Sequence, residues 1–133
     1  VWRNDAIAER WEKLRAARRV VTGALEVERA AKRIGSSLQA APVVHADEAW
    51  RGVLAGVDLD ELCITAGATV SADPPPKDAF AIVDEAGVAV AFRAVEGQKC
   101  ERCWKVLPEV ARTPAHLCLR CEAAVAQIDH AAE

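Results

Sequence analysis

The chain has 133 residues, of which 52% are hydrophobic, and a formal net charge of −3. This length suits one domain or two small units, and no apolar run reaches the roughly 18 residues that a membrane span needs, so we expect no membrane partner. The acidic total argues against a general affinity for nucleic acid.

The charge is unevenly distributed along three predicted units. Residues 1–35 carry nine Lys and Arg against five Asp and Glu, residues 36–96 carry three against ten, and residues 97–133 carry five of each. Basic contact surfaces are therefore confined to the two ends of the chain. The chain has no Met, even at position 1, so we expect a piece cut from a longer protein. The odd cysteine count and the lack of a visible signal peptide favour a reducing, cytoplasmic compartment.

Residues 5–34 are predicted to form one long helix, with Asn4 or Asp5 as its N-cap and Gly35 ending it. The apolar stripe drifts around this helix, which indicates that its two halves pack against different partners, and a partner outside the chain stays open. A third face collects arginines. It is either a solvated face with ion pairs along the helix or a phosphate-facing surface, and the phosphate hypothesis concerns Arg15, Arg18 and Arg19.

Residues 36–96 are predicted to form a small β-α-β-β-β unit, which makes the chain an α+β protein. The predicted elements are a strand over 38–45 that Pro42 places at an edge, a helix from Asp47 to about Leu54, a strand over 62–70, and a hairpin of strands 79–83 and 88–95. Cys63, within the second strand, is expected to be a small core residue.

Residues 97–133 contain two C-x-x-C pairs, separated by fourteen residues and followed by a predicted helix over 119–130. Two such pairs can supply the four thiolates of one tetrahedral zinc ion, and a site filled by four protein ligands leaves no position for a catalytic water. The predicted ligands are therefore Cys100, Cys103, Cys118 and Cys121 of a zinc-ribbon-like module with a structural role. His116 is a competing ligand, although we expect it to lie in the loop.

Basic residues and one tryptophan surround the two cysteine pairs. Trp104 either packs over the metal site or offers a face for stacking on a base. Its neighbours favour the second role, and the candidate RNA contacts in this module are Lys99, Arg102, Trp104, Lys105 and Arg120. The chain has no Gly-rich phosphate loop, no His-Glu-x-x-His and no pair of carboxylates that spacing brings together, so nothing in it indicates catalysis.

Several segments resemble the C-terminal end of bacterial isoleucyl-tRNA synthetases and occur in that family's order. They are Trp11-x-x-Leu14, Ala24-Leu-Glu-Val-Glu-Arg29, Lys32-x-Ile-Gly-Ser-Ser-Leu38, Gly67-Ala-Thr-Val70, Gly97-x-Lys-Cys-x-Arg-Cys-Trp104 and Cys118-x-Arg-Cys121. The cysteine segment is also similar to the finger that ends formamidopyrimidine-type DNA glycosylases, whereas the long helix and the β unit are not.

The resemblance implies a class I ligase that joins isoleucine to its tRNA at the expense of ATP. It implies that residues 1–35 complete the helical anticodon-binding domain, that the zinc module helps to engage the anticodon arm, and that the partners are the isoleucine tRNA and the upstream domains of a monomeric synthetase. The family's two ATP-binding motifs are absent here, so this fragment is expected to be non-catalytic and ATP to concern only the full-length enzyme. Two alternatives stay open: a purely structural, zinc-stabilised appendage, and a DNA-binding zinc ribbon like that of the glycosylases.

Overall fold

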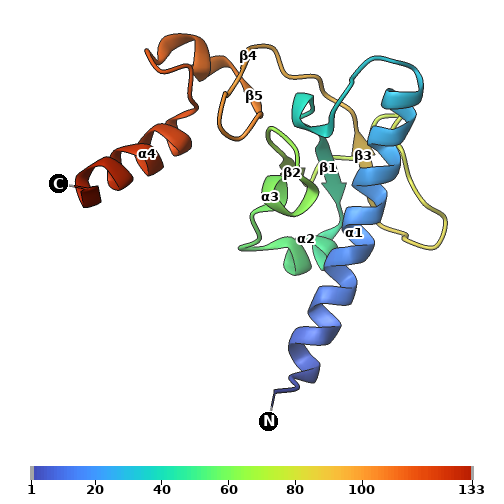
Figure 1. Ribbon diagram of the computed structural model, residues 1–133. Helices are drawn as coiled ribbons and strands as arrows, with labels where there is room; N and C mark the ends of the chain where they lie inside the picture. Colours follow the sequence, from blue (N-terminus) through green and yellow to red (C-terminus); the bar gives the residue numbers. More distant parts are fainter. Residues whose placement is uncertain (1, 133) are drawn as a thin grey trace.

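The computed structural model describes residues 2–132, which form a long helix, a small mixed sheet with its own helices, and a separate C-terminal module (Figure 1). This arrangement confirms the predicted α+β class. In chain order the elements are α1 (Asp5–Ala30), η1 (Ser37–Gln39), β1 (Val43–Ala46), α2 (Glu48–Leu54), α3 (Leu59–Cys63), β2 (Thr69–Ser71), β3 (Val88–Ala91), β4 (Gln98–Lys99), β5 (Val106–Leu107), η2 (Pro108–Arg112) and α4 (Leu119–Ala132), where η1 and η2 are 3-10 helices.

Helix α1 begins where the sequence predicts, because the Asn4 side chain accepts a hydrogen bond from the Ile7 amide. It ends four residues early, at Ala30 rather than 34. Lys32 takes a left-handed conformation (φ 58°), and the amide of Arg33 turns back to the Glu28 carbonyl at 3.0 Å. This is the geometry of a Schellman cap, with a lysine where glycine is usual.

The middle of α1 is its buried part. The stretch from Leu14 to Leu25 contributes to the main core, whereas residues 5–13 are all exposed. Ile7 and Trp11 therefore form an apolar strip without cover on the N-terminal third of the helix.

The sheet has the order β2-β1-β3, with β1 parallel to β2 and antiparallel to β3. The edge position predicted for the first strand is wrong, because β1 is central. Pro42 lies just before the strand and takes part only through its carbonyl, which accepts from the Thr69 amide at 3.1 Å. Its missing N–H therefore costs the ladder nothing.

Two further strand predictions are wrong. Residues 59–63 form helix α3, because Leu59 and Cys63 lie one helical turn apart and both reach the core. Residues 79–83 contribute only one bridge, between Phe80 and Val90, and β3 pairs with β1 instead of forming a hairpin. Cys63 is nevertheless buried, as expected, and the predicted helices at 47–54 and 119–130 are confirmed as α2 and α4.

Two hydrophobic clusters share no residue. The larger joins α1, the sheet, α2 and α3; the smaller lies in the C-terminal module around Cys100, Val110, Cys118 and Cys121. In the part of the chain that the structure describes, no helix combines the length and the hydropathy that a bilayer crossing requires.

Candidate metal centre

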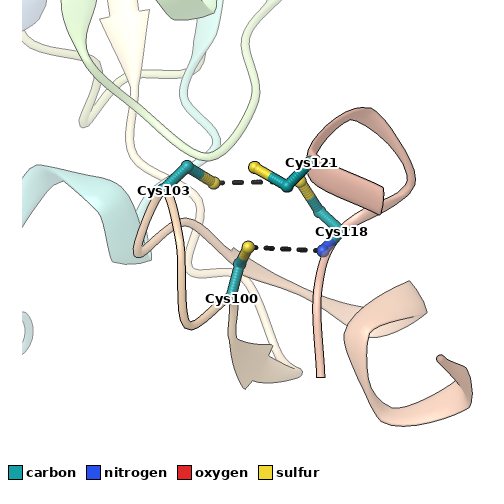
Figure 2. A group of neighbouring side chains, drawn as sticks. All are labelled: Cys100, Cys103, Cys118 and Cys121. Carbon is teal, nitrogen blue, oxygen red and sulfur yellow. Dashed lines mark hydrogen bonds between the residues drawn. The ribbon is translucent and has the colours of Figure 1, made fainter. Parts of the chain in front are cut away.

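Each pair of cysteines lies at a turn that is set by local backbone bonds. Cys100 follows β4, and the Trp104 amide donates to the Cys100 carbonyl at 2.9 Å. This hydrogen bond closes the backbone turn that contains Cys100 and Cys103. Cys118 precedes α4 and Cys121 lies in its first turn. A β-hairpin and a helix N-terminus thus each supply two thiols, which point toward a common space in Figure 2.

The four sulfur atoms are close enough together to share one tetrahedral zinc ion. All of them lie within 4.8 Å of one another, and the sulfurs of Cys103 and Cys118 are 3.8 Å apart. Zinc–sulfur bonds of about 2.3 Å in a tetrahedron place sulfurs about 3.8 Å apart. An all-thiolate, mostly buried donor set of this size fits zinc and leaves no open coordination position.

The protein environment favours ionisation of Cys100 and opposes that of Cys103 and Cys118. Burial opposes ionisation of Cys100, but hydrogen bonds from the backbone amides of Cys103, Cys118 and Arg102 outweigh it and lower the pKa of that thiol to about 6. Burial raises the pKa of Cys103 to about 12 and also raises that of Cys118. Cys103 and Cys118 thus depend on the charge of a bound cation to become thiolates.

A buried threonine organises the loop that brings the second pair back. The Thr113 hydroxyl accepts from the Leu117 amide at 3.0 Å and donates to the Leu117 carbonyl at 2.6 Å. His116 lies in this loop, is exposed and does not belong to the sulfur cluster. The structure therefore gives the four-cysteine set without histidine.

Two of the predicted RNA-binding residues contact the acidic end of α3 instead of lying free. The ammonium of Lys105 is 2.7 Å from Asp60 and 3.3 Å from Glu61, and its side chain is only 13% exposed. Arg120 pairs with Glu61 as well. Both basic side chains are therefore already engaged within the chain.

The other three predicted RNA contacts of the module, Lys99, Arg102 and Trp104, lie in or next to the first cysteine turn. Trp104 is 59% exposed, and the Lys99 ammonium lies 4.7 Å from its ring centroid, a cation–π distance. The Arg102 guanidinium lies 3.5 Å from the Cys121 sulfur, and this hydrogen bond raises the pKa of Arg102. It offsets part of the charge of about −2 that four thiolates leave on a zinc site.

The three predicted arginines of α1 line one shallow hollow of about 340 Å³ together with Thr22. Arg18 donates to the Leu62 carbonyl at 3.0 Å, and Arg19 pairs with Glu85 at 3.1 Å. Arg15 is exposed on the same hollow. Arg18 and Arg19 are thus held in place by contacts outside α1, and both still border the hollow.

Asp60 and Glu61 are the residues of this region that the sequence prediction overlooks. Assigning 62–70 to a strand hid the short helix that carries them. The signal was present, because Asp58, Asp60 and Glu61 concentrate acid in a segment that faces a basic module.

The zinc finger family found in FPG and IleRS matches residues 97–124, which contain all four cysteines. With the sulfur geometry, this match identifies the cluster as a structural zinc site.

Longer matches extend over most of the chain. The isoleucine–tRNA ligase of Ruegeria pomeroyi is 56% identical over 108 residues, which are 80% of this chain and 11% of that ligase. Those of Brucella abortus and Rhodopseudomonas palustris are 53% and 52% identical over 85% and 82% of this chain.

This chain spans only about a ninth of the length of these relatives. Matches over 80–85% of the chain go well beyond the finger at residues 97–124. Over most of its length, the chain is similar to isoleucine–tRNA ligases and matches their C-terminal region.

Proposed function

We propose that this chain is the tRNA-facing C-terminal region of an isoleucine–tRNA ligase and that its zinc module helps to engage the anticodon arm of the isoleucine tRNA. The chain would contribute binding, while activation of isoleucine with ATP would take place in domains outside it. Because tRNA charging accompanies translation, we place it in the cytoplasm, and we expect a monomer joined to the upstream domains of the same synthetase.

One observation carries the proposal: a large aromatic side chain is held outward at the zinc turn. Trp104 has a left-handed backbone (φ 69°), which is unfavourable for a bulky residue and is retained here by the Cys100 turn. The ring is exposed and the Lys99 ammonium lies over one face of it, so an unpaired base could stack on the other face while the ammonium meets phosphate. The arginine hollow of α1 offers a second contact for the RNA backbone.

The test compares Trp104→Ala, Trp104→Phe and Ile128→Ala in the ligase that contains this chain. Loss of one base–aromatic stack costs about 1–3 kcal/mol, so Trp104→Ala should raise the Kd for the isoleucine tRNA by about 5- to 150-fold, with Trp104→Phe in between. Ile128 is an equally exposed apolar residue of the same module and serves as the control. Isoleucyl-adenylate formation and zinc content should not change in any variant. Unchanged tRNA affinity in Trp104→Ala would refute the role of this residue.

Arg102→Ala is a less clean test, because Arg102 also contacts a zinc ligand. A loss of tRNA affinity in this variant supports a tRNA contact only if zinc affinity is unchanged. Arg15→Ala avoids this problem, since Arg15 lies far from the metal in sequence and borders only the α1 hollow.

A second candidate, a purely structural appendage, is favoured by the engagement of Lys105 and Arg120 with α3. It predicts that Cys103→Ser lowers the thermal stability of the ligase while Trp104→Ala and Arg15→Ala leave tRNA affinity unchanged.

The DNA-binding alternative has less support, because the similarity to the ligases extends far beyond the finger. It predicts tighter, salt-dependent binding to duplex DNA than to the isoleucine tRNA.

A further inference from the structure

The zinc module and the α/β unit are joined without a shared apolar core. The module's cluster contains Val110, Leu107 and Leu117 with the four cysteines, and no member of it belongs to the larger cluster around α1 and the sheet. Figure 1 shows the module beside the sheet unit, connected by the extended segment after β3. The two parts therefore share no buried apolar cluster that would fix how they are oriented.

The side-chain bonds that connect the two parts among residues 2–132 are ionic. They form one cluster, which we call the α3 latch: Asp60 and Glu61 from α3, with Lys105 and Arg120 from the module. Lys105 lies two residues after Cys103, and Arg120 lies between Cys118 and Cys121. Both cysteine turns are thus tied to the same short helix.

The opposite side of α3 is tied to α1. Ile64 follows the helix in a left-handed conformation (φ 56°). Its amide and that of Thr65 both donate to the Asp60 carbonyl. The Leu62 carbonyl therefore has no partner inside the helix. The Arg18 guanidinium donates a hydrogen bond to that carbonyl at 3.0 Å. A cation is favourable there, because the carbonyls at a helix C-terminus carry partial negative charge. Helix α3 therefore connects the arginine hollow of α1 with the zinc module.

We propose that α3 fixes the orientation of the zinc module relative to α1 through the α3 latch, so that Trp104 and the α1 arginines meet the same RNA arm. The second half of this statement rests on the proposed function, and the first half does not. Asp60 and Glu61 act as positioning residues, because they affect RNA binding only through the orientation of the module, which they hold by Lys105 and Arg120. A latch made of partly exposed ion pairs, unlike an apolar interface, weakens as salt concentration rises.

The first experiment measures orientation in the zinc-loaded chain by residual dipolar couplings of backbone amides. In the wild type at low salt, one alignment tensor should fit both residues 5–92 and residues 98–132. In Asp60→Asn/Glu61→Gln, a single tensor should fail and the couplings of the module should fall severalfold. The control, Asp78→Asn/Asp84→Asn, removes the same charge from exposed positions outside the latch and should behave as the wild type.

A charge swap excludes a loss of folding as the cause. Asp60→Lys should release the module, and adding Lys105→Asp should restore the single tensor. If the double neutralisation leaves one tensor for both parts, the latch is refuted, whatever the tRNA assays show.

The second experiment separates the latch from the proposed function. In the ligase, Asp60→Asn/Glu61→Gln should weaken tRNA binding by about 5- to 50-fold without changing isoleucyl-adenylate formation, if loss of the latch uncouples two contacts of ordinary strength. Released orientation with unchanged tRNA affinity would overturn the alignment role. If Trp104→Ala were also silent, the proposed function itself would fail while the latch stood.

Discussion

Replacing Gly97 by alanine tests how the zinc module depends on one close backbone approach. Gly97 lies just before β4 with φ +149°, a conformation that side chains rarely adopt. A Cβ there would lie 2.5 Å from the Leu107 carbonyl oxygen and 2.7 Å from the Pro108 nitrogen. Both are backbone atoms, in Leu107 of β5 and in the Pro108 that follows it, so no side-chain rotation relieves the clash.

The cost has two parts. Holding alanine in this conformation costs about 1–3 kcal/mol, and overpacking against backbone costs about another 1–3 kcal/mol. Because folding of so small a module is coupled to its metal, the loss of about 2–6 kcal/mol should be seen as weaker zinc binding, by about 30- to 20,000-fold.

The assay is competition for zinc with a chromogenic chelator, compared with Gly52→Ala as the control. Gly52 lies within α2, and a Cβ there meets nothing within 4 Å. Gly52→Ala should therefore keep wild-type zinc affinity and stabilise the α/β unit by about 0.5–1 kcal/mol. If Gly97→Ala bound zinc within threefold of Gly52→Ala, the close approach would not matter and the reasoning would be wrong.

Three further outcomes are expected. Stripping zinc with a chelator should collapse the amide cross-peaks of residues 98–132 while those of Val20, Val44 and Val90 remain, because the larger core contains no zinc ligand; loss of both sets would contradict two separate cores. Burial raises the pKa of Cys63 to about 11, so at pH 8 only about one thiol in a thousand is ionised, and mapping of iodoacetamide adducts should find Cys63 unmodified until the chain is unfolded. Ile64→Asn should stabilise the chain by about 1 kcal/mol in denaturant unfolding, because Ile64 is 53% exposed yet left-handed and asparagine tolerates that conformation; a loss of stability would mean that its side chain packs more than its exposure indicates.

The sequence alone determined the local features of this protein. Asn4 and Asp47 cap their helices because a side-chain oxygen within three residues of a free amide needs no help from the rest of the fold. The four cysteines could likewise be assigned as zinc ligands from the sequence, since two C-x-x-C pairs match the geometry of one tetrahedral metal ion.

Only the tertiary structure decided which basic residues are available. In sequence, Lys105 and Arg120 are indistinguishable from Lys99, since all three flank cysteine turns. Folding places the first two against Asp60 and Glu61, some forty to sixty residues away, and leaves Lys99 beside Trp104 on the surface. Long-range contacts also made 59–63 a helix, with Leu59 and Cys63 in the same core as α1, and pairing with β2 on one side and β3 on the other made β1 a central strand. Charge is a property of the residue, but its availability to a ligand depends on the partners that the fold brings to it.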